Sequence, residues 1–479
     1  MKPRIFFISI VVLFLCRCIA WYLFPLYDDA FITFQYASNL VQHGQFVFSL
    51  DIWVQAVTCP LYSLILTPLF LFSHFPQKII PLLNILIECS ILWLSRDLFL
   101  NQTKQSFYLI FGLMISLSPL LARVSVGGME MPFLVLGYIL LLIAVKNRNT
   151  FMVGIPALSA IMFFIRPEAS ILAIISVVYL WIIHGWKKTI FPALCGLLIA
   201  LIGMLIMQLV YQSPLPQSLM AKSEHISEGF TITAMQLFAP EPMSLVIHSI
   251  VFLSFIWIIY ARIKLSHWMY INASWYVLYA LAYVLARPSI WSWYGYPLVF
   301  MAILHIVGMV EILSHHLWIK RLETALQSKI VLVIPLVIWF GISAKSTPER
   351  ITKNIYDRLQ NSEYFKGNKL ETIVAGDVGA IGYFTKKRII DVNSLVWINK
   401  SQHITSASMV DIIEKEKPDY MFLNATRSQI NLIQSRYIDA YQTIDRYDKD
   451  GSSISTMDSA IYPDIVWRQD YLLLKRKQQ

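Results

Sequence analysis

A succession of twelve apolar runs constrains the fold of this chain more than any other feature. A helix needs about 20 apolar residues to cross a bilayer, and most of the runs approach or exceed that length. The chain is 57% hydrophobic and only 14% charged, whereas about 25% of the residues in a soluble domain are charged. We therefore expect an α-helical polytopic membrane protein. The runs lie at about 5–26, 59–75, 78–95, 106–122, 131–145, 151–165, 169–185, 189–211, 243–262, 268–286, 296–318 and 329–344.

Lysine and arginine residues gather at the ends of these runs, and they predict an orientation. Cytoplasmic loops carry an excess of Lys and Arg. This topology explains the net charge of +10 better than nucleic-acid binding does. Run 5–26 has no small-residue cleavage site before Asp28, so we expect an uncleaved first helix with a cytoplasmic N-terminus. The residues assigned to cytoplasmic ends are Arg96, Lys104, Lys146, Arg148, Lys187, Lys188, Arg262, Lys264, Lys320 and Arg321.

Run 59–75 is the exception to simple crossing. Asp28 falls outside and Arg96 inside, so an odd number of crossings must separate them. Run 59–75 is short and contains Pro60, Pro68 and His74, which favours a re-entrant or interfacial element. About 11 crossings then remain, and the C-terminus lies outside.

Segment 29–42 has apolar residues at three- and four-residue steps with polar residues between them. This pattern predicts an amphipathic helix in the membrane interface, ended by Gly44. The five cysteines lie in or beside apolar runs and form no C-x-x-C pair, so buried positions are expected for them.

The character of the chain changes near residue 345, and we expect two domains, a transmembrane one over 1–344 and an extracytoplasmic α/β one over 345–479. Segments 372–375, 388–392 and 420–423 are predicted strands, and 410–417 is a predicted helix. Between the first two strands, Gly376-x-x-Gly379 resembles a phosphate loop only weakly, and a tight turn is favoured.

Five polar clusters fall on the outer side in this topology. Each has a structural alternative: Asp28 or Asp29, Glu130 and Glu168 as helix caps, the arginines as interfacial anchors, and the aromatic residues as an interfacial belt. Together they supply carboxylates, cations and aromatic rings to one compartment, which suits a site for a lipid phosphate and a sugar. The clusters are Asp28-Asp29, 123–130, Arg166-Pro167-Glu168, 211–222 and 287–297.

The run Asp28-Asp29-Ala30-Phe31-Ile32-Thr33-Phe34 continues through His43-Gly44 and resembles the first external loop of polyprenyl-phosphate-dependent membrane glycosyltransferases of the GT-C fold. It is most similar to the subgroup that contains the cell-wall arabinofuranosyltransferases. Later segments resemble further motifs of that subgroup, in order: 128–130, 166–169, 214–222, 376–384 and 390–391. Segment 49–58 lacks the usual pattern of the subgroup, and Gln217-Ser218 stand where it has Asn-Thr.

The resemblance implies inverting transfer of a sugar from a polyprenyl-phosphate donor to a cell-envelope glycan, lipopolysaccharide-like or glycolipid acceptor. It implies Asp28 as the general base, with Asp29 orienting it, binding substrate or holding a divalent metal. The two side chains are about 100° apart on a helix and cannot share one direction. Candidate phosphate or substrate contacts are Arg166, Glu168, Glu130, Lys222, Arg287 and Tyr294.

The expected location is the bacterial inner membrane, with the C-terminal domain periplasmic or extracellular and the lipid bilayer as a partner. Two other function classes stay open. A transporter or flippase for a lipid-linked sugar also needs polar groups near a lipid phosphate, but it needs them accessible from both sides. A structural assembly protein with an external interaction domain is the third.

Overall fold

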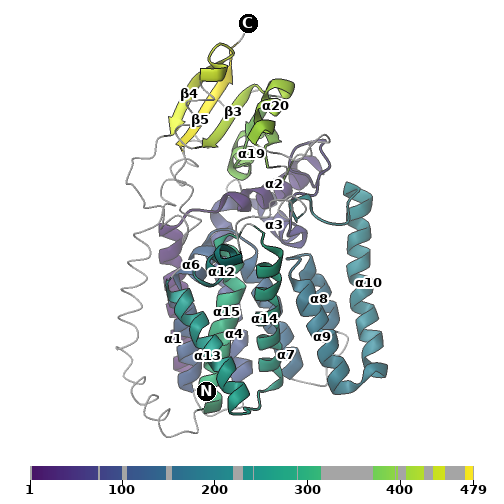
Figure 1. The fold of residues 1–479 in the computed structure, drawn as a ribbon, viewed down its shortest axis with the longest axis vertical. Coiled ribbons are helices and arrows are strands. Elements are labelled where there is room, and N and C mark those ends of the chain that lie inside the picture. Colours follow the sequence, from purple (N-terminus) through teal and green to yellow (C-terminus); the bar gives the residue numbers. More distant parts are fainter. Residues whose placement is uncertain are drawn as a thin grey trace.

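The computed structural model describes residues 3–73, 76–99, 105–146, 154–219, 230–240, 242–288, 290–313, 371–393, 395–396, 406–425, 435–447 and 470–477. It shows a helical bundle with a small sheet at one end, and the N-terminus lies at the other end (Figure 1). The helices are α1 (Pro3–Leu23), α2 (Asp28–His43), α3 (Pro60–Phe72), α4 (Pro76–Phe99), α5 (Gln105–Leu117), α6 (Pro119–Val126), α7 (Met131–Lys146), α8 (Gly154–Phe163), α9 (Ala169–His184), α10 (Trp186–Tyr211), α12 (Phe230–Phe238), α13 (Pro242–Tyr260), α14 (His267–Ala286), α15 (Ser292–Leu313), α19 (Gly379–Thr385) and α20 (Ser406–Glu416).

Within the described residues, six helices are long and apolar enough to cross a membrane: α1, α4, α10, α13, α14 and α15. The pair α5 and α6, bent by 64° at its break, is either a broken seventh span or a re-entrant loop. The protein is therefore a multi-pass membrane protein. The expected count of about 11 also requires the shorter helices α7, α8 and α9 and the run 329–344, which lies outside the described residues, so that count stays a prediction. Helix α3 has 13 residues, about 20 Å, which is short of the ~30 Å hydrocarbon core and agrees with a non-crossing element.

The spans differ in how deeply they lie in the bundle. In α15, 83% of the apolar window is buried, whereas in α10 the buried share is 11%. Figure 1 shows α10 at the edge of the bundle, with its length exposed. A helix that is apolar all round and unburied by protein needs lipid around it, so the core of the bundle is centred on α15 rather than on α10.

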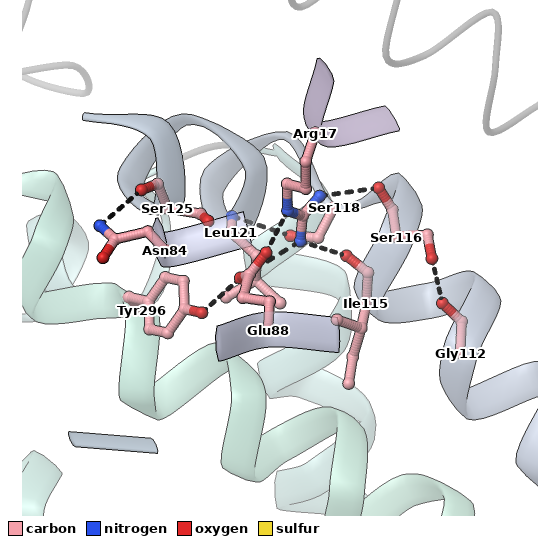
Figure 2. A network of polar contacts seen from close by, with 10 residues as sticks. All are labelled: Arg17, Asn84, Glu88, Gly112, Ile115, Ser116, Ser118, Leu121, Ser125 and Tyr296. Carbon is pink, nitrogen blue, oxygen red and sulfur yellow. Dashed lines mark hydrogen bonds and ion pairs between the residues drawn. The ribbon is translucent and has the colours of Figure 1, made fainter. Parts of the chain in front are cut away.

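A buried ion pair holds the break between α5 and α6 (Figure 2). Pro119 has no N–H, so the carbonyl of Ile115 has no helical donor. Arg17 on α1 donates to this carbonyl at 3.0 Å and to the Ser116 carbonyl at 2.9 Å. Its guanidinium also pairs with Glu88 on α4. Both side chains are almost fully buried, and Glu88 also accepts a hydrogen bond from Tyr296 on α15.

Asn84 lies one turn before Glu88 on α4 and fixes the chain that follows α6. Its side-chain amide donates to the carbonyls of Ser125 and Met129, at 2.9 and 3.0 Å. Ser125 lies in the last turn of α6, which ends at Val126, and Met129 precedes Glu130. The face of α4 that carries Asn84 and Glu88 thus fixes both the break and the loop after it.

Helix α2 begins at Asp28 and ends at His43, with Gly44 in the left-handed conformation, as predicted. Its environment differs from the prediction, because the polar residues Gln35, Ser38 and Asn39 are buried rather than turned to an interface. Asn39 donates to the carbonyls of Val47 and Phe48, at 2.9 Å each. Figure 1 shows α2 lying crosswise between the bundle and α19. The polar stripe therefore hydrogen-bonds to protein, and α2 is an internal helix.

The C-terminal region contains a five-stranded sheet of order β2-β1-β3-β5-β4. The predicted strands are confirmed: β1 pairs in parallel with both β2 and β3, and α19 and α20 form the two connections. The last two strands, which the sequence patterns did not indicate, are antiparallel to their neighbours. The predicted domain boundary at 344/345 lies outside the described residues and stays a prediction. The strands are β1 (Thr372–Ala375), β2 (Arg388–Asp391), β3 (Tyr420–Ala425), β4 (Tyr441–Tyr447) and β5 (Asp470–Arg476).

We predict that Glu88→Leu lowers stability strongly, by about 3–5 kcal/mol, because it leaves the Arg17 guanidinium buried without its counter-charge. The double variant Arg17→Met, Glu88→Leu should recover part of that loss, since no buried charge then remains. Thermal unfolding in lipid nanodiscs measures both. A double variant no more stable than Glu88→Leu would contradict this account of the ion pair.

Candidate active site

A pocket of about 400 Å³ of empty space, including its open mouth, lies where segments far apart in the sequence meet. Asp29 and Thr33 reach it from α2, and Trp293 reaches it from the start of α15. Short loops supply Glu130 before α7 and Arg166 between α8 and α9. The full lining is Asp29, Ile32, Thr33, Ala56, Val57, Thr58, Cys59, Met129, Glu130, Arg166, Ser218, Trp293 and Leu395.

Arg166 is the centre of the charge arrangement. Its Nη1 donates to Glu130 at 2.8 Å, and its Nη2 and Nε donate to the two oxygens of Glu168 at 2.5 and 3.1 Å. The guanidinium also lies 5.0 Å from the centre of the Tyr294 ring. Arg166 thus lines the pocket while two carboxylates and an aromatic ring hold its guanidinium.

Glu168 is held by two donors, Arg166 and the hydroxyl of Tyr283. Burial alone would raise its pKa, but these partners leave the pKa below its ordinary value of 4.5. Glu168 is therefore an anion at neutral pH. Arg166 is thus bound by two carboxylates, Glu130 and Glu168, and a third carboxylate, Asp29, lines the same pocket, so acidic groups outnumber the guanidinium there.

The two neighbouring aspartates diverge, as their positions on a helix predict. Asp29 lines the pocket. Asp28 does not; its two oxygens accept hydrogen bonds from the backbone N–H groups of Gly379 and Ala380, at 2.8 and 2.9 Å. Both oxygens of Asp28 therefore serve the C-terminal region, and Asp29 is the member of the pair that lines the pocket.

The other predicted site residues are distributed as follows. Tyr294 packs behind Arg166 and is buried. Arg287 is exposed at the C-terminal end of α14, away from the pocket lining. Lys222 lies outside the described residues. Among the described residues, no group of three or more His, Cys, Asp or Glu side chains is placed to hold a metal ion.

Two lining residues carried no functional signal in the sequence. Cys59 was expected only as a buried thiol; it is buried, as its apolar surroundings indicate, but at the pocket, with its sulfur 3.4 Å from the Thr33 hydroxyl. Leu395 comes from the loop after β2, and an isolated leucine in a C-terminal domain gives no reason to place it beside a pocket formed mostly by the helical bundle.

Solved structures with a similar fold exist despite low sequence identity. The crystal structure of ArnT from Cupriavidus metallidurans bound to undecaprenyl phosphate matches with a TM-score of 0.59 and 10% identity, over 98% of this chain and 97% of that one. The apo structure of the same protein matches with a TM-score of 0.57 and 10% identity, over 97% of each chain. The chain therefore has a GT-C fold.

Comparison at the level of sequence identifies fewer related proteins than comparison of structures does. A family model described as a domain of unknown function (DUF8728) matches residues 353–464. No curated protein matches the sequence significantly.

We predict that Arg166→Gln costs about 3–5 kcal/mol of stability, since it leaves buried carboxylates without their partner. Arg287→Gln is the matched control and should cost under about 0.5 kcal/mol, as surface substitutions do. Chemical or thermal unfolding at pH 7 compares the two.

The ion pair between Arg166 and Glu168 also makes the stability of the protein depend on pH. The folded-state pKa of Glu168 is depressed, so the stability it contributes is full above its ordinary pKa of 4.5 and is lost as pH falls through the lower folded value. The difference in the free energy of unfolding between wild type and Arg166→Gln should therefore become smaller below about pH 4.5. If that difference in stability instead grew on acidification, Glu168 could not be an ionised carboxylate in the folded protein at pH 7.

Proposed function

We propose that the chain is an inverting glycosyltransferase that moves a sugar from a polyprenyl-phosphate donor to a hydroxyl of a cell-envelope glycan or glycolipid. The observation that carries the proposal is the acidic pocket, in which Asp29 and Glu130 face a space open at one end of a membrane bundle. The GT-C fold adds support, because one similar structure holds undecaprenyl phosphate. The ordered motifs between residues 28 and 391 point to the same reaction class.

We assign the general base to Asp29. It lines the pocket, whereas both oxygens of Asp28 accept backbone hydrogen bonds. In the reaction, the acceptor hydroxyl gives its proton to the Asp29 carboxylate as its oxygen attacks the anomeric carbon. The bond from that carbon to the phosphate oxygen breaks, and polyprenyl phosphate leaves with the bonding electrons. Attack from the face opposite the phosphate inverts the anomeric configuration.

Two further groups are suited to hold the sugar. The Ser218 hydroxyl and the indole N–H of Trp293 both line the pocket and are buried, and neither has a hydrogen-bond partner among the described residues. An unsatisfied buried polar group costs about 1–3 kcal/mol, which a sugar hydroxyl or phosphate oxygen would recover. The Trp293 ring is fixed by stacking on Trp291, with centroids 5.6 Å apart. Its N–H therefore has a set direction.

The phosphate requires cations that the pocket itself does not supply. Arg166 is neutralised by Glu130 and Glu168, so we assign it to holding Glu130 in place. Lys222 and Arg287 stay the candidate phosphate partners. A divalent metal at the acidic pocket would supply the same charge, with Asp29 and Glu130 as the carboxylates nearest to it.

We place the pocket on the extracytoplasmic side of a bacterial inner membrane. Figure 1 shows the N-terminus at the end of the bundle away from α2 and the sheet. The predicted cytoplasmic N-terminus then puts the pocket and the C-terminal sheet outside. Polyprenyl-phosphate sugars used on that face would come from a preceding step that attaches the sugar to the lipid and moves it across the bilayer.

The test is incubation of the purified protein with a labelled polyprenyl-phosphate sugar and an envelope glycan fraction. We expect label in the glycan, with inverted configuration at the transferred sugar. Movement of the labelled lipid between leaflets of vesicles without product would overturn the enzyme in favour of a transporter.

We predict that Asp29→Asn lowers kcat by about 10²–10⁴-fold, the usual contribution of general-base catalysis. Asp51→Asn is the matched control, because Asp51 is exposed on the loop after α2, and it should retain wild-type activity. Steady-state transfer rates measure both. Full activity in Asp29→Asn would exclude Asp29 as the base.

We predict that Trp293→Phe raises KM for the donor roughly tenfold with a smaller effect on kcat, because it removes one hydrogen bond and keeps the ring. Trp291→Phe is the control, because Trp291 stacks on Trp293 and this variant changes the same aromatic packing while it keeps the Trp293 indole N–H. Equal KM changes in the two variants would show that packing, not the indole N–H, accounts for the effect.

A further inference from the structure

The interface between α2 and α19 joins the membrane bundle to the C-terminal sheet. Phe31 on α2 packs against Tyr383 and Phe384 on α19, with ring centroids 5.4 and 5.2 Å apart. Lys386 donates to the side-chain oxygen of Gln35 at 2.7 Å. The contact thus combines aromatic packing and a charged hydrogen bond.

Asp28 forms the polar centre of this interface. Its carboxylate accepts one hydrogen bond on each oxygen, from the N–H groups of Gly379 and Ala380. The approach is so close that a Cβ added at Gly379 would overlap the backbone carbonyl of Asp28. Position 379 therefore requires glycine. The weak phosphate-loop pattern of Gly376-x-x-Gly379 does hold an anion, and the anion is a side chain of the protein itself.

A second buried carboxylate shapes the loop that reaches the pocket. Asp391, at the end of β2, accepts hydrogen bonds from the N–H groups of Asn393, Leu395 and Val396. These bonds curl the chain directly after the strand. Leu395 is a member of this loop and lines the pocket.

The two carboxylates influence each other. Burial raises the pKa of Asp28 to about 6, and the charge of Asp29 adds to the rise while the two amides oppose it. Burial likewise raises the pKa of Asp391 to about 7, and the charge of Asp28 contributes to that rise. Asp28 at the start of α2 and Asp391 at the end of β2 thus belong to the two sides of the interface between the bundle and the sheet.

We propose that Asp28 is a positioning residue: it fastens α19 to α2 and thereby sets the Asp391–Val396 loop, so that the C-terminal domain forms a wall of the pocket through Leu395. Asp28 touches no substrate in this proposal. It acts through the sheet, because α19 and β2 are adjacent elements and the loop follows β2 directly. The Asp28-Asp29 pair then joins two tasks in neighbouring residues, the first holding the wall and the second facing the substrate.

The proposal rests on the proposed transfer reaction only for its activity readout. Its structural readout is hydrogen–deuterium exchange on the full-length protein in nanodiscs. We compare wild type with Asp28→Asn and Gly379→Ala, which disturb the same contact from opposite sides. Asp439→Asn, an exposed aspartate in the C-terminal region, is the matched control.

We expect Asp28→Asn and Gly379→Ala to speed exchange at least tenfold at Gly379 and Ala380, and also in segment 391–396, which Asp28 does not touch. Both should lower kcat/KM at least tenfold, and each by less than Asp29→Asn. Leu395→Ala should lower kcat/KM without changing exchange at Gly379 and Ala380. The control should change neither quantity.

Unchanged exchange in segment 391–396 in both interface variants would overturn the proposal, and so would wild-type activity in either variant once its exchange has increased. The proposed function fails separately, if wild-type protein gives no product while its amides at 379–380 are protected. Gly379→Ala leaves every carboxylate intact, so a loss of activity there is not the loss of a base at Asp28.

Discussion

The ion pair between Arg17 and Glu88 makes the bent span possible, and the pocket depends on that bend. A helix broken inside a bilayer leaves carbonyl groups that no water can satisfy. Here Pro119 creates the break, and Arg17 supplies the missing donors to Ile115 and Ser116. A lone guanidinium at this depth would be costly, so Glu88 neutralises it and Tyr296 completes the acceptor set of Glu88. After the bend, α6 ends at Val126 and the chain reaches Glu130 at the pocket.

A second buried ion pair, between Glu130 and Arg166, lies at the pocket. Glu130 is buried and needs a counter-charge, which Arg166 provides while it also binds Glu168. Among the described residues of the pocket lining, Arg166 is the one Lys or Arg side chain, and it is paired with two carboxylates rather than free for a phosphate. If the donor lipid is bound as proposed, its sugar lies beside the carboxylates of the pocket. Its phosphate then lies toward the cations Lys222 and Arg287. Such separation keeps the base and the leaving group on opposite sides of the anomeric carbon, which inverting transfer requires.

Local features of the fold could be predicted from the sequence, since they depend on local rules. The helical pattern of α2, its end at Gly44 and strands β1 to β3 follow from periodicity and from the glycine stop. The aspartate cap that the sequence allowed is absent at the start of α2, because the N-cap is Tyr27 and no side chain caps the helix there. The environment of α2 could not be predicted, because Gln35, Ser38 and Asn39 find their partners in the segments that fold back on them. An amphipathic pattern shows that a helix has a polar face; it does not show whether water or protein covers that face. Leu395 was missed for a related reason, since only the assembled interface brings it to the pocket.

The acidic pair at the start of α2 shows most clearly where sequence reasoning ends. Helical geometry alone establishes that Asp28 and Asp29 point about 100° apart, and therefore that one base at most comes from the pair. Choosing between them requires knowing that Gly379 and Ala380, about 350 positions later in the chain, each present one N–H group to the first aspartate. A motif match weights both residues equally, because both stand in the same run. The backbone donors separate them: both oxygens of Asp28 are engaged by the N–H groups of Gly379 and Ala380, whereas Asp29 lines the pocket, and this difference in position is why we propose the second aspartate as the base.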